Sequence, residues 1–188
     1  RDLAPPPPLW ERGSVQLQDF GATHPKGETA KPVLVIPSLV NRSYIMDLTS
    51  DRSFLRFLAS KGLRPLLLDW GTPGEAELAH TLDDCIDGTL RDALAIAVET
   101  GSGGPVPVIG YCMGGTLAAA LAVLEPEKCG ALVLLASPWD FHVATGGPPA
   151  AVSSGGAVLE QIISASGYLP VDTLQTMFFS LDPLLGWN

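Results

Sequence analysis

The sequence predicts an α/β fold in which helices cover both faces of a doubly wound, mostly parallel sheet. Apolar runs alternate with segments of helical periodicity between residues 32 and 137. The runs lack the polar alternation of half-exposed strands, as expected of a parallel sheet that is buried on both faces. A cysteine stands between glycines where one run gives way to a helical segment, a position typical of chemistry in such sheets.

Four apolar runs predict buried strands, and three segments between them predict helices. The strands are expected at 32–37 (PVLVIP), 63–70 (LRPLLLDW), 106–111 (VPVIGY) and 131–137 (ALVLLAS). The first helix is expected within 50–62, with Ser50 as its N-cap and Gly62 as its stop. The second spans 78–100, where an apolar residue recurs every fourth position, and the third, rich in small residues, spans 113–124. Right-handed crossovers then determine the winding.

The two ends of the chain differ from this regular pattern. Residues 1–12 contain four consecutive prolines and predict a polyproline-like arm, and residues 13–20 predict a solvent-edged strand that a polar loop follows. Residues 13–142 are expected to form the N-terminal part of the α/β core. Residues 143–188 read as a Gly/Pro/Ser-rich linker and the start of a helical cap or lid. We expect the sheet to be incomplete and the sequence to be a piece of a longer protein.

The composition limits the classes of function. Hydrophobic residues make up 46% of the 188 residues and charged residues 16%, which is more apolar than a typical soluble domain. A net charge of −9 argues against nucleic acid as a partner. No run reaches the roughly 18 apolar residues of a membrane span, so no transmembrane segment is expected. The three cysteines, widely spaced and without a CxxC motif, predict no disulfide framework and no metal site, and they fit a cytoplasmic location.

The run Gly110-Tyr111-Cys112-Met113-Gly114 has the form of a nucleophile elbow, G-x-S-x-G, with sulfur in place of oxygen. Such a turn from strand to helix strains the backbone at the nucleophile and leaves no room for side chains at the flanking positions. Cys112 is therefore predicted to be a nucleophile whose thiolate the helix N-terminus stabilises, and the N–H of Met113 is predicted to hold an oxyanion. The alternative is a buried structural cysteine. Cys85 and Cys129 are expected to be core or surface fillers.

The loop after the first regular strand, residues 36–41, is the second candidate site segment. In elbow enzymes this loop supplies the other oxyanion N–H, and Leu39 or Val40 are the candidates here. The alternative is an ordinary strand–loop connection in which Pro37 ends the ladder.

A nucleophilic thiol needs a base, and the chain contains three histidines, His24, His80 and His142. Only His142 follows the cysteine, two residues after Asp140, so one hypothesis makes this pair the base and its orienter. The hypothesis we favour places the base and acid beyond residue 188, because the histidine normally follows the last strand of the sheet. Asp140 is then a polar loop residue, and His24 and His80 face solvent.

Several motifs together resemble the polyhydroxyalkanoate synthases. These are Pro37-Ser38, Val40-Asn41, Tyr44-Ile45-Met46-Asp47-Leu48, Trp70-Gly71-Thr72-Pro73, the cysteine box Gly110–Thr116, Asp140-Phe141 and Gly146. The resemblance covers roughly residues 30 to 147. It departs from the family at Ser38, which replaces the usual second proline and changes the expected shape of the loop.

The resemblance implies an α/β-hydrolase fold and an enzyme that polymerises (R)-3-hydroxyacyl-CoA into polyester and releases CoA. Cys112 would carry the acyl group, and Met113 with Val40 or its neighbour Leu39 would form the oxyanion hole. The family's catalytic Asp and His have no counterpart here. No cofactor is expected, since the CoA thioester is a substrate. The expected partners are hydroxyacyl-CoA, hydrophobic polyester, and the missing C-terminal half or a partner subunit. A homo-oligomer and association with polyester granules are also expected.

Two other functions stay open at the level of sequence. One is a hydrolase of the same fold with a cysteine nucleophile, which acts on esters, lactones or polyester and uses water as the acceptor. The other is a non-catalytic relative that binds polyester granules or an active subunit. The isolated chain is expected to be inactive if its base and acid lie elsewhere.

Overall fold

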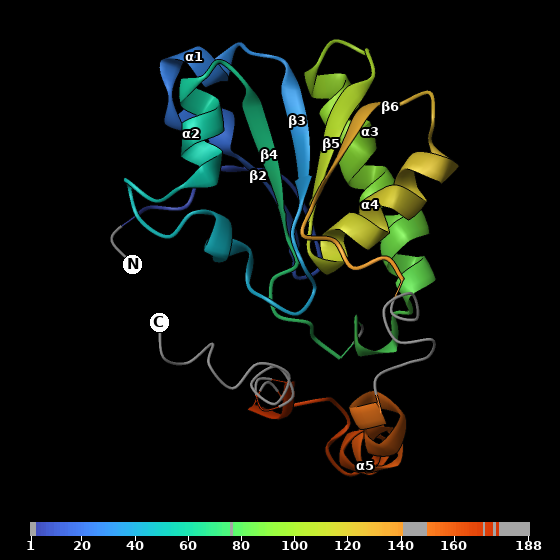
Figure 1. Ribbon diagram of the computed structural model, residues 1–188. Helices are drawn as coiled ribbons and strands as arrows, with labels where there is room; N and C mark the ends of the chain where they lie inside the picture. Colours follow the sequence, from blue (N-terminus) through green and yellow to red (C-terminus); the bar gives the residue numbers. More distant parts are fainter. Residues whose placement is uncertain (1–2, 76, 141–149, 171, 175, 177–188) are drawn as a thin grey trace. The chain divides into compact units, whose positions relative to one another are not determined.

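Figure 1 shows a computed structural model of the chain, which describes residues 3–75, 77–140, 150–170, 172–174 and 176. The chain divides into two units, residues 1–139 and residues 140–188. The first unit contains a six-stranded sheet in the order β1-β2-β4-β3-β5-β6. The second unit contains helix α5, Ala150–Ser166.

The four predicted strands are all present and run parallel. They are β3 (Pro32–Ile36), β4 (Arg64–Asp69), β5 (Val106–Tyr111) and β6 (Cys129–Leu135). Strand β3 pairs with both β4 and β5, and β5 pairs with β6. Because these strands are parallel, their carboxyl ends meet at one edge of the sheet, where the loops after β3, β4 and β5 come together.

Two antiparallel strands extend the sheet beyond β4 and correct two predictions. Strand β1 (Pro8–Arg12) lies in the segment predicted to be an unfolded proline-rich arm, and it pairs with β2 (Val15–Asp19). Trp10 pairs with Leu17 and packs against the core, while Pro8 takes the first position of an edge strand, where proline is tolerated. Strand β2 is therefore an inner strand between β1 and β4, not a solvent-edged one.

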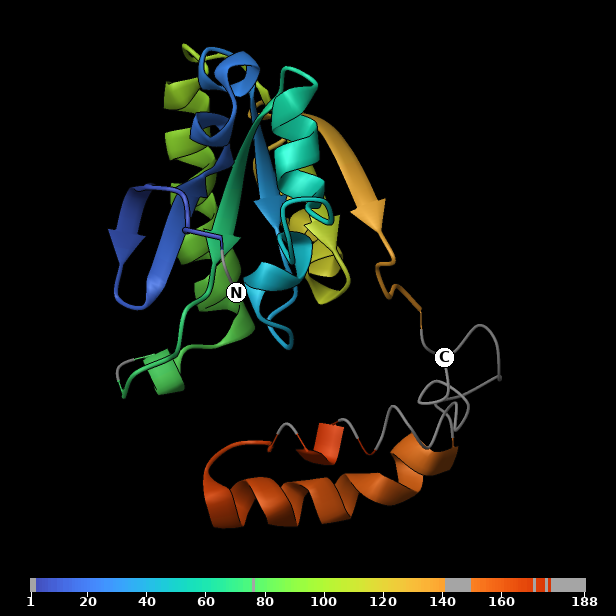
Figure 2. The same cartoon turned by 90° about the vertical axis from the view of Figure 1, so that its left-hand side faces the viewer.

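Helices cover both faces of the sheet, as the alternation of buried side chains along β3 shows. Leu34 and Ile36 face a core that also contains Leu94 of α3 (Arg91–Thr100) and Leu117 of α4 (Met113–Leu124). Val33 and Val35 belong to a second core. This core also contains Phe20, Met46 and one residue of α2 (Phe54–Ser60), which is Leu55. Figures 1 and 2 show α2 on one side of the sheet and α3 and α4 on the other. The predicted doubly wound arrangement is confirmed.

The helices differ in detail from the prediction. The N-cap of α2 is Ser53, whose Oγ accepts a hydrogen bond from the Arg56 N–H at 3.0 Å, so the prediction of Ser50 is wrong. The second predicted helix contains a π-helical segment, η4 (Asp84–Leu90), that continues into α3. The remaining short helices are η1 (Phe20–Thr23), α1 (Pro25–Glu28), η2 (Ser43–Met46) and η3 (Glu77–Ala79). The first two lie largely in the segment predicted to be a polar loop.

Strand β6 departs from the expected burial on both faces. Leu132, Val133 and Leu134 are each about two-fifths exposed, because among the described residues β6 pairs only with β5. In contrast, all five residues of β3 are buried. An outer strand built entirely of apolar side chains is unusual for a protein surface.

The predicted linker is helical from residue 150 onward, since α5 begins there, and residues 141–149 lie outside the described residues. The helical segment expected at the start of a lid is therefore longer than the sequence indicates. No helix within the described residues is long and apolar enough to span a membrane.

The Asp19–Arg64 ion pair offers a test of this packing. Arg64 on β4 contacts Asp19 at 2.7 Å, and these side chains are only 21% and 6% exposed. We expect Arg64→Met to lower the free energy of unfolding by about 3 kcal/mol, because it leaves a buried carboxylate without its cation. Arg12→Met removes an ion pair with Asp92 whose side chains are about half exposed, and it should cost less than about 1 kcal/mol. Equal losses in urea denaturation would contradict this account.

Candidate active site

Cys112 is the single residue between the end of β5 and the start of α4. Its backbone has φ +52° and ψ −129°, a region that residues with a side chain rarely adopt. Holding a residue in such a conformation costs on the order of 1–3 kcal/mol. The tight, strained turn expected from the sequence is therefore present, and Cys112 itself is half-buried.

The glycines of the box are required by close backbone contacts. A Cβ on Gly114 would lie 2.3 Å from the carbonyl oxygens of both Ile36 and Pro37, at the carboxyl end of β3. A Cβ on Gly110 would lie 2.4 Å from the Cα of Gly115 in the first turn of α4. No real Cβ approaches backbone atoms this closely. The first turn of α4 thus packs directly on β5 and on the loop that follows β3.

The loop after β6 also contacts the turn at Cys112, in addition to β5 and the loop after β3. The Cys112 N–H donates to the carbonyl of Leu135 at 2.9 Å, and the Thr116 hydroxyl donates to the carbonyl of Pro138 at 2.8 Å. A Cβ on Gly115 would also collide with the side chain of Ser137. The cysteine is consequently held between the carboxyl ends of β3, β5 and β6.

Two backbone N–H groups, one adjacent to Cys112 in the chain and one in the loop after β3, have no hydrogen-bond partner among the described residues. Met113 is the first residue of α4, and its N–H has no hydrogen-bond partner among the described residues. In the loop after β3, the Val40 N–H donates to the Oγ of buried Ser38 at 3.1 Å, whereas the Leu39 N–H has no partner in the described part of the chain. Of the two residues predicted to supply the second oxyanion N–H, Val40 has its N–H engaged and Leu39 does not, and the oxyanion role itself stays a prediction.

The segment after β4 forms hydrogen bonds with the loop after β3 at both ends of that loop. The Trp70 Nε1–H donates to the carbonyl of Pro37 at 3.3 Å, just before Ser38 and Leu39. At the other end, Nη1 of Arg42 donates to the carbonyl of Gly71 at 2.8 Å and to the Thr72 Oγ1 at 3.0 Å. The sequence shows Trp70 as part of a motif but indicates no role for it, because no local pattern reveals a contact with Pro37.

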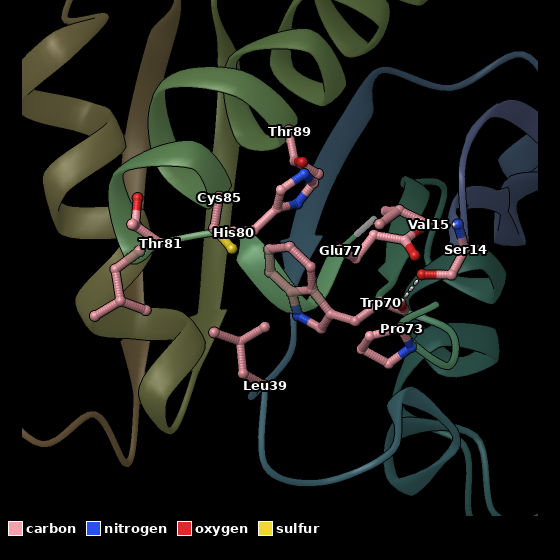
Figure 3. A pocket seen from close by; sticks show the side chains of 11 residues that line it. Ser14, Val15, Leu39, Trp70, Pro73, Glu77, His80, Thr81, Cys85 and Thr89 are labelled. Atoms are coloured by element: carbon pink, nitrogen blue, oxygen red, sulfur yellow. Dashed lines mark hydrogen bonds between the residues drawn. The ribbon is translucent and has the colours of Figure 1, made fainter. Parts of the chain in front are cut away.

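A cavity of about 280 Å³ lies beside this loop, as Figure 3 shows. Its apolar wall consists of side chains from the start of β2, from the loops after β3 and β4, and from a position two residues before the π-helical segment: Val15, Leu39, Trp70, Pro73 and Leu82. Glu77 lies at the polar side, where its carboxylate accepts hydrogen bonds from the N–H groups of Ser14 at 2.7 Å and Gly74 at 2.6 Å. These two bonds lower the pKa of Glu77, first that from Ser14.

The other two cysteines have environments unlike that of a reactive thiol. Cys85 is half-buried and lines the cavity, and burial, followed by the charge of Asp84, raises the pKa of its thiol. Cys129 is the first residue of β6, and burial, followed by the charge of Glu125, raises the pKa of its thiol. Both thiols are therefore protonated at neutral pH, and the environment of neither cysteine indicates a catalytic role.

The histidines are not gathered around Cys112 in the described residues. His80 is exposed, as predicted, and reaches the rim of the cavity. His24 is partly exposed, and its Nδ1 accepts the Lys26 N–H at 3.1 Å and caps α1. Asp140 is exposed, and His142 lies outside the described residues. The base and acid of a triad therefore remain a prediction.

The fold agrees with comparisons to known proteins. The family described as alpha/beta hydrolase fold matches residues 31–154. The chain belongs to the α/β-hydrolase fold family. Among solved structures, the thioesterase domain from the curacin biosynthetic pathway aligns with 94% of this chain and 61% of its own, at TM-score 0.57 and 19% identity. A Mycobacterium tuberculosis protein aligns with 75% of this chain and 46% of its own, at TM-score 0.50 and 24% identity. At such identities the likeness concerns the fold alone.

Sequence relatives within this α/β-hydrolase family confirm the resemblance to the polyhydroxyalkanoate synthases. The poly(3-hydroxyalkanoate) polymerase subunit PhaC of Thiocystis violacea is 34% identical over 161 residues, which covers 85% of this chain and 45% of that protein. The protein of the same name from Synechocystis sp. is 33% identical over 164 residues, which covers 84% of this chain and 43% of that protein. The chain thus spans less than half the length of these relatives.

Replacing Gly114 with alanine tests the close packing of the turn. Because the new Cβ meets two backbone oxygens, we expect Gly114→Ala to lower the free energy of unfolding by about 2–3 kcal/mol. Gly104→Ala is the matched control, since a Cβ there meets nothing within 4 Å, and its effect should stay within about 0.5 kcal/mol. Thermal and urea unfolding measure both. A Gly114→Ala protein as stable as the control would show that α4 does not pack on β3 in this way.

Proposed function

We propose that this chain carries the nucleophile of an acyltransferase that polymerises (R)-3-hydroxyacyl-CoA through a thioester on Cys112. The observation that supports this most strongly is the strained turn, which presents the cysteine at a helix N-terminus beside the loop of Leu39. The names of the polymerase relatives support the substrate class. The proposed reaction uses the CoA thioester as a substrate and needs no resident cofactor.

In the first proposed half-reaction, the sulfur of Cys112 attacks the thioester carbonyl of the substrate. The oxygen of the tetrahedral intermediate accepts hydrogen bonds from the N–H groups of Met113 and Leu39, which have no other partner in the described residues. The bond to the CoA sulfur then breaks, and CoA leaves with the proton that the cysteine has lost. The acyl group stays on Cys112 as a thioester.

In the second half-reaction, the hydroxyl of another 3-hydroxyacyl group attacks this thioester. An ester bond forms, the bond to the Cys112 sulfur breaks, and a base removes the hydroxyl proton. Sulfur suits this exchange because one thioester replaces another with little loss of free energy, so the acyl group remains activated. An oxygen ester on a serine would be a more stable intermediate from which chain growth is harder.

The partners proposed for the chain are hydroxyacyl-CoA, hydrophobic polyester and further protein. The exposed apolar residues of β6, Leu132, Val133 and Leu134, support a surface that packs against more protein, either a C-terminal half or a partner subunit. The apolar composition supports the proposal that the enzyme acts at the surface of polyester granules. A homo-oligomer remains a prediction.

The test follows CoA release and product during incubation of the full-length protein with (R)-3-hydroxybutyryl-CoA. We expect polymer from the wild type and a loss of CoA release of about 10³-fold or more in Cys112→Ala, because the nucleophile is gone. Cys129→Ala is the matched control and should retain activity. Release of free 3-hydroxybutyrate without polymer would show that the protein is a hydrolase of the same fold and not a synthase. Unchanged CoA release by Cys112→Ala would remove Cys112 from the mechanism.

A further inference from the structure

The turn between β1 and β2 begins a series of contacts that ends at the first turn of α4. Ser14, the second residue of this turn, donates a hydrogen bond from its hydroxyl to the carbonyl of Trp70 at 3.1 Å, which Figure 3 shows. The Ser14 N–H donates to the carboxylate of Glu77 at 2.7 Å. A Cβ on Gly71 would collide with the Ser14 carbonyl. The turn therefore holds the segment after β4 at three points.

Trp70 connects that segment to the loop after β3. Ser14 holds its backbone carbonyl, and its ring packs against the core that contains Leu117 of α4. Its indole N–H donates to the carbonyl of Pro37 at 3.3 Å. Strand β3 ends at Ile36, so Pro37 lies beyond the last ladder pair of that strand. A carbonyl in this position needs a donor other than a neighbouring strand, and the indole of Trp70 is such a donor.

The carbonyl of Pro37 lies against the first turn of α4. A Cβ on Gly114, two residues after Cys112, would collide with this oxygen and with that of Ile36. Because no space separates these backbone groups, a shift of the Pro37 carbonyl displaces Gly114. The Gly115 N–H donates to the carbonyl of Cys112 at 2.8 Å, so the cysteine follows the first turn of the helix.

The strained backbone of Cys112 makes its position depend on these surrounding contacts. A residue with φ +52° stays in that conformation only when the structure around it holds it there. The rate of a reaction at such a residue is sensitive to small shifts, since a misplacement of about 1 Å can cost about 10²-fold. A residue that holds the turn from outside therefore affects the rate without any contact with the substrate.

We propose that Trp70 is a positioning residue for the acyl transfer at Cys112, and that Ser14 acts through Trp70. The inference rests on the proposed function for the identity of the reaction. The indole N–H of Trp70 fixes the Pro37 carbonyl against α4, and the Ser14 hydroxyl fixes the backbone of Trp70. The N-terminal hairpin thus contributes to the geometry of the nucleophile turn as well as to the sheet.

The first test removes only the N–H of Trp70. The analogue 3-benzothienylalanine, which carries sulfur in place of the indole N–H and has nearly the same shape, is incorporated at position 70 of the full-length protein. We expect kcat for CoA release from (R)-3-hydroxybutyryl-CoA to fall about tenfold and KM to stay within about twofold, because no substrate contact is removed. The same analogue at position 10 is the matched control, since Trp10 packs against the same core. It should change neither constant.

A merely structural role of Trp70 would change other quantities. Urea unfolding of both analogue proteins measures that role separately from catalysis. A lower free energy of unfolding at position 70 with unchanged kcat would overturn the proposal. A rise in KM with unchanged kcat would also overturn it, because it would show that Trp70 contributes to substrate binding instead.

Ser14→Ala tests the contact between the hairpin and Trp70. We expect kcat to fall about threefold, and to fall less than about 1.5-fold further when Ser14→Ala is added to the analogue at position 70, since both changes act through one residue. Ser60→Ala is the matched control, because the Ser60 hydroxyl also donates to a backbone carbonyl, that of Phe57 at 2.7 Å, at the end of α2. It should leave kcat unchanged. Losses that multiply in the double variant would contradict the role of Ser14.

The positioning proposal and the acyltransferase proposal fail in different ways. The rate at which iodoacetamide alkylates Cys112 reports on the turn without turnover, and the free thiol of Cys129 serves as the internal reference. If the wild type releases no CoA but the analogue at position 70 slows Cys112 alone by about threefold or more, the acyltransferase proposal fails and Trp70 still positions the turn. If the wild type releases CoA and the analogue changes neither kcat nor this alkylation rate, the positioning proposal alone fails.

Discussion

The contact between the first turn of α4 and the carboxyl end of β3 is the constraint on which the rest of the site depends. With Gly114 this close to the carbonyls of Ile36 and Pro37, there is no space for a side chain between the helix and the loop. The contact forces the chain to turn at a single residue, Cys112, in a strained conformation. It also places the first turn of α4, which begins at Met113, against the start of the loop that carries Leu39. One packing contact thus determines where the thiol and the helix N-terminus lie relative to this loop.

The loop after β3 links this contact to the cavity beside it. The Ser38 hydroxyl accepts a hydrogen bond from the Val40 N–H, while Trp70 and Arg42 fasten the loop to the segment after β4. Leu39, which lies in this loop, also lines the cavity.

The parts of the molecule that could be predicted are those that local chemistry determines. The runs that became β3, β4 and β5 are apolar because both sheet faces are covered, and the glycines around Cys112 report a turn that only glycine permits. The turn and the resemblance to a family could be read from these residues alone.

The parts that could not be predicted depend on contacts distant in sequence. The prolines around the start of β1 predict a polyproline-like arm and give no sign of a strand. The strand forms because Trp10 has a core to pack against. The choice between Leu39 and Val40 depends on the direction in which the Ser38 hydroxyl points. The role of Trp70 depends on a carbonyl 33 residues away. Each of these follows from tertiary packing, which leaves no periodic signal in the sequence.

The central claim is that the strained turn makes Cys112 the residue that accepts the acyl group. The most direct measurement is the intact mass of the full-length protein, quenched in acid soon after mixing with (R)-3-hydroxybutyryl-CoA, followed by peptide mapping. The account predicts a mass increase of at least one 3-hydroxybutyryl group that maps to Cys112 and that hydroxylamine removes, as expected of a thioester. An adduct on Cys85, on Cys129 or on a hydroxyl residue would contradict it, as would polymer formation with no adduct at any time.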